Sequence, residues 1–103
     1  MAISLDNKPR KVRRWYQEHV YMVHNFRMLY DQKGNANDLG ERRRVGRKMK
    51  HLQKKIGQHM KKGEFLGLSE AEMKSFSRAI IEETRNGKSP RTIIQSFFKN
   101  GRK

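Results

Sequence analysis

The sequence of 103 residues contains no cysteine and no long apolar run. The lack of cysteine excludes a disulfide framework and thiolate chemistry, which fits a reducing compartment. No stretch approaches the roughly 20 apolar residues that span a bilayer, and no apolar segment of a secretory signal precedes Asp6. We therefore expect no membrane partner and a cytoplasmic location, associated with the nucleoid in a prokaryote, with the nucleus as the alternative in a eukaryote.

Acidic residues are also scarce, and this imbalance is the main indication of function. Ten Asp and Glu stand against 25 Lys and Arg, which leaves a formal net charge of +15. Such a charge repels itself within a compact chain and favours anionic partners. The length suits one domain, so residues 1–103 are interpreted as a single small basic helical domain with mobile ends at 1–7 and 100–103.

Patterns that carry catalysis are missing too. The sequence has no glycine-rich phosphate loop, no nucleophile motif and no paired carboxylates spaced for acid–base chemistry. The four histidines lack the neighbouring ligands of a zinc site, and His19 falls within an apolar stripe, where a core role is expected. We therefore expect a non-enzymatic protein without a metal or cofactor.

Apolar residues at alternating steps of four and three predict a first amphipathic helix over about 9–32. This stripe comprises Val12, Tyr16, His19, Val23, Phe26 and Tyr30. Pro9 suits the first helical turn, Asp6 or Asn7 could cap it, and Gly34 is expected to end it. Tyr21 and Met28, on the other side, could be covered by later helices or by a second copy of the chain.

Asp38 and Glu41 have the spacing of a capping box and open a second predicted helix over about 38–62, ending at Gly63. Its narrow apolar seam comprises Val45, Met49, Leu52, Ile56 and either His59 or Met60. Two long helices joined by a short polar loop predict an antiparallel hairpin. EFLGL, residues 64–68, is expected to plug the end of that hairpin.

Two shorter helices are predicted over about 69–86 and 90–99. Ser69 with Glu72 forms a second capping box, and Ser89 followed by Pro90 restarts the chain as a helix. Because no segment has the alternation of a strand, the fold class is all-α, with these two helices packed on the hairpin.

The second predicted helix carries ten Lys or Arg and no acid between residues 42 and 62. At about 100° per residue, these side chains lie in two rows away from the apolar seam. The outer row, opposite the seam and about 27 Å long, comprises Arg43, Arg47, Lys50, Lys54 and Lys61. The second row comprises Arg44, Lys48, Lys55 and Lys62, and Arg42 stands at the arginine-rich start.

A solvated polar face is the ordinary interpretation of such a run. However, solvated helices usually mix charges and gain from Glu–Lys pairs at i,i+4, which are impossible here. Several like charges instead stand at i,i+4, including Arg43–Arg47 and Lys50–Lys54. The arrangement therefore favours a surface that binds a polyanion.

KPRKVRR, residues 8–14, places a second basic cluster at the start of the first helix, where positive charge opposes the helix dipole. A basic arm on a nucleic-acid backbone, a solvated helix end and a nuclear import signal all remain open. The auxiliary candidates there are Lys8, Arg10, Lys11, Arg13 and Arg14.

GKSPRTIIQSFFKNG, residues 87–101, resembles the turn and recognition helix of TetR-type helix-turn-helix proteins. The matching positions are Gly87, Ser89, Thr92, Ile93 and Phe97. The chain departs from that family at Glu83, where a small buried residue is usual. The resemblance implies a DNA-reading helix, whereas the alternative is a capped helix that packs on the core. Either arrangement would expose Arg91, Gln95 and Lys99, and Arg91 and Lys99 are further auxiliary candidates.

These observations together predict a small protein that binds nucleic acid, DNA more than RNA, by gripping the phosphate backbone through the basic helix. One alternative is an interaction module, of the kind a phage or mobile element uses, that docks on an acidic patch of a host protein. A binder of structured RNA or the ribosome is another. The sequence leaves monomer and homodimer open.

Overall fold

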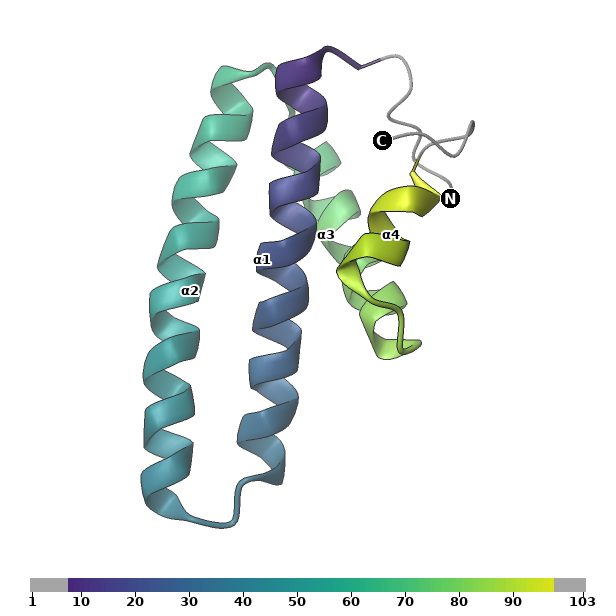
Figure 1. The fold of residues 1–103 in the computed structure, drawn as a ribbon. Helices are drawn as coiled ribbons and strands as arrows, with labels where there is room; N and C mark the ends of the chain where they lie inside the picture. The colour runs from purple at the N-terminus through teal and green to yellow at the C-terminus, as the bar shows by residue number, and fades with distance from the viewer. Residues whose placement is uncertain (1–7, 98–103) are drawn as a thin grey trace.

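The computed structural model describes residues 8–97 and confirms the all-α prediction. Helices α1 (Arg10–Asn35) and α2 (Leu39–Phe65) form a long antiparallel hairpin (Figure 1). The shorter helices α3 (Glu70–Arg85) and α4 (Pro90–Ser96) pack against α1. No strand occurs within residues 8–97. The ends expected to be mobile, 1–7 and 100–103, lie outside the described residues, as do the candidate caps Asp6 and Asn7.

Helix α1 continues beyond the predicted end at residue 32 and passes through Gly34 to Asn35. Glycine can adopt helical φ and ψ angles, so Gly34 weakens α1 without ending it. The chain leaves the helix at Ala36, which is buried and extended at φ −75° and ψ 128°. The Ala36 carbonyl accepts a 2.9 Å hydrogen bond from Arg42 Nε, which fixes the loop against the start of α2.

Helix α2 also runs past its predicted end, because Gly63 is a packing residue and not a stop. A Cβ at position 63 would lie 2.7 Å from Met73 Sδ and 2.9 Å from two ring carbons of Trp15. Only glycine lets the three elements approach so closely. The turn that follows the helix uses Gly67 instead, whose φ of +93° allows the Leu68 N–H to bond the Gly63 carbonyl.

The expectation that residues 64–68 plug the hairpin is therefore only partly right. Leu68 is buried and Leu66 is half-buried against the core. Phe65, however, belongs to the last turn of α2 and is 92% exposed. The structure thus places a large aromatic ring in solvent where the sequence suggested a buried one.

The predicted caps of the C-terminal helices are confirmed. Ser69 and Glu72 form a complete capping box at the start of α3, and the Ser89 hydroxyl accepts from Thr92 N–H at the start of α4. Gly87, at φ +84°, turns the chain between the two helices. Helix α4 ends at Ser96, earlier than the predicted residue 99, which lies outside the described residues.

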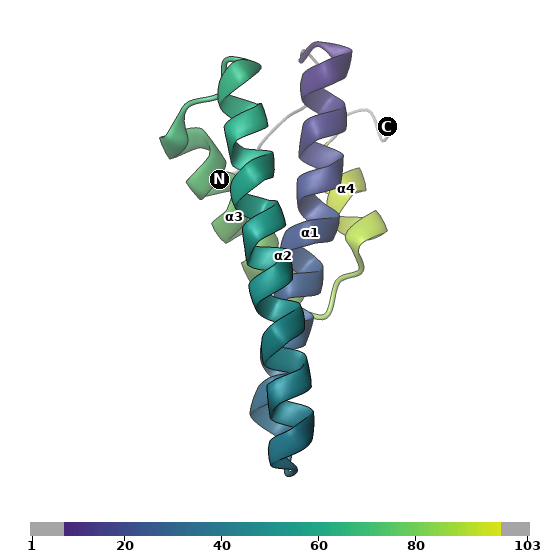
Figure 2. The ribbon, with the colours of Figure 1, turned by 90° about the vertical axis from the view of Figure 1, so that its left-hand side faces the viewer.

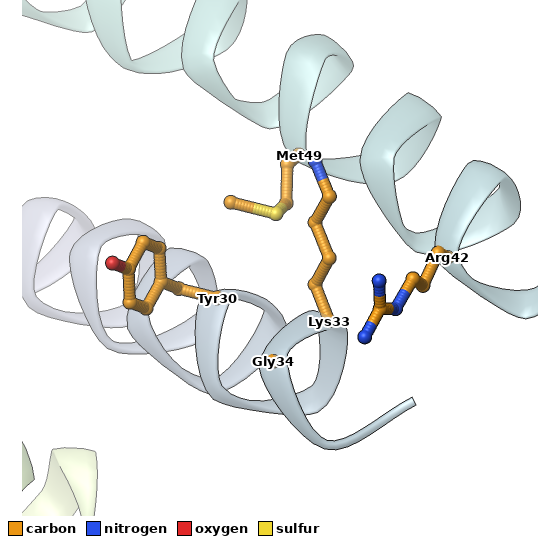
Figure 3. Close-up of a pocket in the computed structure, with 5 residues that line it drawn as sticks. All are labelled: Tyr30, Lys33, Gly34, Arg42 and Met49. Atoms are coloured by element: carbon orange, nitrogen blue, oxygen red, sulfur yellow. The ribbon is translucent and has the colours of Figure 1, made fainter. Parts of the chain in front are cut away.

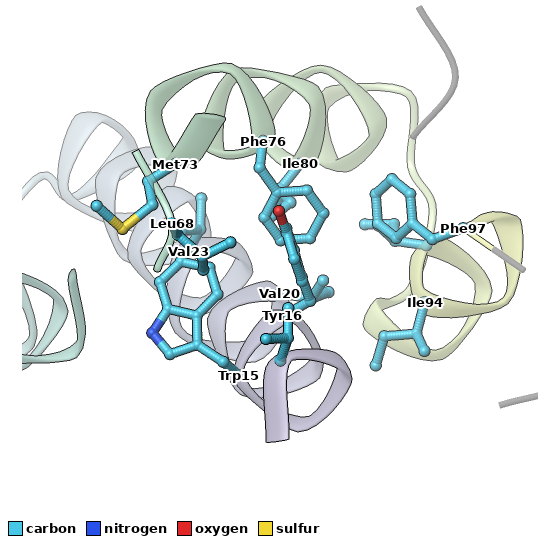
Figure 4. Close-up of a cluster of buried hydrophobic side chains, with 12 residues drawn as sticks. Trp15, Tyr16, Val20, Val23, Leu68, Met73, Phe76, Ile80, Ile94 and Phe97 are labelled. Carbon is cyan, nitrogen blue, oxygen red and sulfur yellow. The ribbon is translucent and has the colours of Figure 1, made fainter. Parts of the chain in front are cut away.

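The core lies between α1, α3 and α4 (Figure 4). Helix α2 adds the partly buried side chain of Met60 at the edge of this core. The buried apolar members of the core are Val12, Trp15, Tyr16, Val20, Val23, Leu68, Met73, Phe76, Ile80, Ile93, Ile94 and Phe97. On the predicted seam of α2, Val45 and His59 are buried, but Met49, Leu52 and Ile56 are only half-buried. The far half of the hairpin extends beyond α3 and α4 (Figure 1), so α1 is the one described helix that covers that part of the seam.

Two histidines stack on Trp15 within this core. The ring centroids of His19 and His59 each lie 4.6 Å from that of the indole, and 5.4 Å from one another. Trp15 Nε1 donates to the His59 carbonyl at 2.7 Å, and His59 Nε2 donates to the Trp15 carbonyl at 3.0 Å. This reciprocal pair joins α1 to α2, and burial lowers the pKa of His59 below its usual value.

His19 is the core histidine that its position in the stripe predicts, with no exposed surface. The Ser77 hydroxyl donates to the Met73 carbonyl at 3.0 Å, so His19 Nε2 donates to Ser77 Oγ at 2.8 Å. This arrangement leaves His19 Nδ1 buried without a partner. Burial, and to a smaller extent His59, lowers the pKa of His19 from 6.5 to about 4.

Candidate functional site

Helix α2 stands at one edge of the molecule, and its face away from α1 is uncovered (Figure 2). It packs on α1, touches α3 near its end, and has no contact with α4. All ten basic residues singled out from the sequence are exposed on it: Arg42, Arg43, Arg44, Arg47, Lys48, Lys50, Lys54, Lys55, Lys61 and Lys62. Val45, the first residue of the apolar seam, is buried.

None of these ten cations is paired with a carboxylate within residues 8–97. The described ion pairs all lie elsewhere: Arg27–Asp31 at 3.2 Å, Lys74–Glu70 at 2.9 Å and Lys88–Glu83 at 2.7 Å. The like charges along α2 therefore repel one another without local compensation. This surface of ten residues is called the α2 basic face below.

A shallow hollow of about 600 Å³ indents the start of the α2 basic face. Its apolar lining includes Phe26 and Met49, and Arg43, Arg47 and Lys50 stand around it. A neighbouring hollow of about 410 Å³ lies between the end of α1 and the start of α2 (Figure 3). The combination of apolar lining and cationic margin suits an anion that also presents an apolar surface.

Lys33 belongs to this region, although sequence reasoning did not include it. Its side chain extends from α1 across to α2 (Figure 3), and its Nζ would lie 3.6 Å from a Cβ at position 46. Lys33 thus lies over Gly46 and adds an eleventh cation beside the α2 basic face. The signal was present in the sequence, because residue 33 continues the stripe of α1 by a step of three after Tyr30.

The basic cluster at the start of α1 is divided between different surroundings. Lys11 and Arg14 line a hollow of about 350 Å³ together with Lys62, so they extend the charge at the end of α2. Arg10 and Arg13 line a different hollow on α1, and Arg14 lines this second hollow as well. Lys8 is half-buried and contributes to lowering the pKa of Glu72, after the hydrogen bonds that this carboxylate accepts from Ser69.

The auxiliary residue on α4 does not join the α2 basic face. Arg91 and Gln95 are exposed, but α4 lies on the opposite side of α1 from α2 (Figure 1). Glu83, the position where the chain departs from the TetR-type pattern, pairs with Lys88 across the turn. Lys99, the remaining auxiliary candidate, lies outside the described residues. A DNA-reading role of α4 remains a prediction.

Phe65 is a further exposed residue that the sequence analysis did not predict, because residues 64–68 were expected to be buried. It stands four residues after Lys61, so it occupies the next position of the outer row, at the end where α2 meets the start of α1. Phe65, Leu66 and Trp15 form the apolar part of the hollow that Lys11, Arg14 and Lys62 line. The outer row of cations therefore ends at an exposed aromatic ring.

Among residues 8–97, no group of three or more potential metal ligands lies close together. Within that same range, no helix has the length and apolar character required to cross a bilayer. Tyr21 and Met28 are about half exposed, so the alternative in which the later helices cover them is wrong. Burial by a second copy of the chain stays a prediction.

Comparison with known proteins gives no relative for this chain. No family model, no curated protein and no solved structure matches it.

Proposed function

We propose that this protein binds duplex nucleic acid, DNA in preference to RNA, through the α2 basic face and without catalysing a reaction. The observation that carries the proposal is a row of exposed cations on an uncovered helix, with no carboxylate paired to them within residues 8–97. A partner with regularly spaced negative charges would relieve their repulsion. Each neutralised phosphate would also release counterions, which supplies the free energy of binding.

The dimensions of α2 support a duplex partner. Arg43 and Lys61 are about 27 Å apart along the helix axis. Because DNA rises about 3.4 Å per base pair, a row of this length laid parallel to the duplex axis would span roughly eight base pairs, and fewer if the helix followed the inclined groove. The B-DNA major groove, about 12 Å wide, admits an α-helix, whereas the major groove of an RNA helix is deep and narrow. This difference in groove width favours DNA.

The two halves of α2 would contribute differently. Arg43, Arg44 and Arg47 provide planar guanidinium groups that clamp a phosphate through two hydrogen bonds, or contact guanine edges. The lysines of the second half provide point charges that follow the backbone. Backbone contacts position a protein on the duplex but carry little sequence information, so we expect weak sequence preference and steep salt dependence.

The proposal is tested with a fluorescent DNA duplex of roughly 20 base pairs, more than twice the span of the outer row. Affinity is measured by anisotropy from about 50 to 200 mM salt, in competition with single strands, a structured RNA and an acidic polypeptide. We expect the duplex to compete best and the affinity to fall with salt. Failure to bind any nucleic acid at about 50 mM salt would refute the proposal, and binding only to the acidic polypeptide would replace it with a protein partner.

Charge reversal on α2 locates the surface. Arg43→Glu combined with Arg47→Glu should weaken duplex binding at least tenfold and reduce the slope of log affinity against log salt by about two. The matched control is Arg78→Glu combined with Arg85→Glu, on exposed positions of α3. Both double variants have the same net charge, so equal losses of affinity would show that net charge and not the α2 basic face controls binding.

A further inference from the structure

We infer that the end of the hairpin around Phe65 is a stacking site for an unpaired nucleobase, so that the protein prefers a duplex with a single-stranded extension. This inference rests on the proposed function, because it takes the duplex along the α2 basic face as its starting point. It adds a second ligand class, an unpaired nucleotide, and a residue that recognises it.

The first observation is the exposure of Phe65. The side chain is 92% exposed, more than any other large apolar residue described, including Leu39 at 62%. A ring held in water on the last turn of a long helix gains nothing from the core. Its two faces are available for stacking, which is how proteins bind unpaired bases without reading their sequence.

The second observation is the position of Phe65 relative to the charges. It follows Lys61 by one helical step in the outer row, so a nucleic-acid backbone that tracks Arg43, Lys54 and Lys61 arrives at the ring. An aromatic residue at the end of such a row meets the base that follows the last phosphate contact. Within a duplex that base is stacked and paired. In a single-stranded extension the base is unpaired, so it can turn out of the base stack and pack on the ring.

The third observation is the hollow beside the ring. About 350 Å³ in volume, it has an apolar part formed by Trp15, Phe65 and Leu66. Lys11, Arg14 and Lys62 line the same hollow and outnumber its single acid, Glu18. A nucleotide has the matching two-part chemistry, because a flat apolar base is joined to a negatively charged phosphate. The start of α1 would thereby hold the phosphates of the extension.

The experiment compares three DNA ligands: a duplex with flush ends, the same duplex with a three-nucleotide extension, and an extended duplex whose first unpaired nucleotide lacks its base. The third ligand keeps every phosphate and removes only the stacking surface. Extensions of 5′ and 3′ polarity are tested separately. Wild-type protein should bind the extended duplex of one polarity about 5- to 100-fold more tightly than the ligand that lacks the base.

Phe65→Ala should abolish this difference and leave the affinity for the flush duplex unchanged, while Phe65→Trp should retain it. Leu39→Ala, which removes an exposed apolar residue at the other end of α2, is the matched control and should keep the wild-type preference. Because position 65 is almost fully exposed, thermal unfolding should not change between the variants.

The outcomes separate the two proposals. If the wild-type protein binds flush and extended duplexes equally, or if Phe65→Ala retains the preference, the stacking site is wrong although duplex binding stands. If no nucleic acid binds at all, the proposed function fails, and the stacking site fails with it.

Discussion

His19 is a titratable ring whose neutral form is built into the core. Its Nε2 donates to Ser77, and its Nδ1 is buried with no partner, so a proton on Nδ1 would place a charge where nothing stabilises it. The pKa of His19 is accordingly lowered from 6.5 to about 4 by burial. The buried histidines are therefore structural in this fold, and their chemistry is expressed as a pH dependence of stability.

Between pH 6.5 and about 4, the unfolded chain binds a proton at His19 that the folded chain does not bind. The free energy of unfolding should therefore fall by about 3 kcal/mol as the pH drops through this interval, with the contribution of His19 fully present above pH 6.5. Denaturant titrations at several pH values measure this dependence. His19→Gln should reduce it and leave the part that His59 contributes, whereas His51→Gln, at an exposed position, should leave it unchanged. Equal slopes in all three proteins would contradict the assignment to His19.

At the scale of the element, the crossing of α2 over α1 and α3 depends on Gly63. A methyl group there would meet Trp15 and Met73 at 2.7 to 2.9 Å, in a region where the Trp15 ring is already stacked against two histidines. These neighbours hold the Trp15 ring in place, so it cannot move aside without disturbing their stacking. The position therefore controls how closely the end of the hairpin packs on the core.

Gly63→Ala should destabilise the protein by about 1–3 kcal/mol through overpacking. Gly57→Ala is the matched control on the same helix, because a Cβ at position 57 meets nothing within 4 Å. It should stabilise the protein by up to about 1 kcal/mol, since alanine favours helix over glycine. Chemical denaturation compares the two. A stabilised Gly63→Ala variant would mean that Trp15 and Met73 leave room for a methyl group at position 63.

The helices could be predicted from the sequence because apolar spacing and capping residues are local features of the chain. Apolar spacing predicted both long helices, and Ser69 and Ser89 marked the starts of α3 and α4 correctly. Gly63 was misinterpreted because a glycine that ends a helix and a glycine that admits a neighbour look identical in one sequence. Only the approach of Trp15 and Met73, which is a tertiary fact, distinguishes them.

The same limit applied to the candidate site. The side of α2 that carries the cations could be predicted, because helical geometry fixes direction from spacing. The spacing within α1 placed Lys33 on the stripe that faces α2, so this residue could have been included. The separation of Arg91 from α2 depends on how the helices pack, and the spacing within one helix does not contain that information. The exposure of Phe65 also depends on where α2 ends relative to α1.

At the scale of the whole molecule, the excess positive charge would link stability to the proposed function. The chain carries +15, and the described ion pairs leave the α2 basic face uncompensated. Repulsion among exposed charges is strong at low ionic strength and is screened beyond about 10 Å at 0.1 M salt. An exposed surface of like charges should therefore lower the stability of the free protein, most of all in dilute buffer.

This trade-off predicts an increase in stability from a variant that loses binding. In the double variant Arg43→Glu with Arg47→Glu, the acid at position 47 would attract Arg44 and Lys50, each three residues away, although positions 43 and 47 would still repel one another. The variant should raise the free energy of unfolding at low salt by about 0.5–1 kcal/mol. The gain should shrink as salt is added, and thermal unfolding from low to high salt measures it.

Arg78→Glu with Arg85→Glu lowers the net charge equally but places two acids near Glu82, so it should give no gain. If both variants gained equally, the repulsion would belong to the whole molecule and not to α2. A gain confined to the α2 variant would identify the α2 basic face as a site of local repulsion in the free protein.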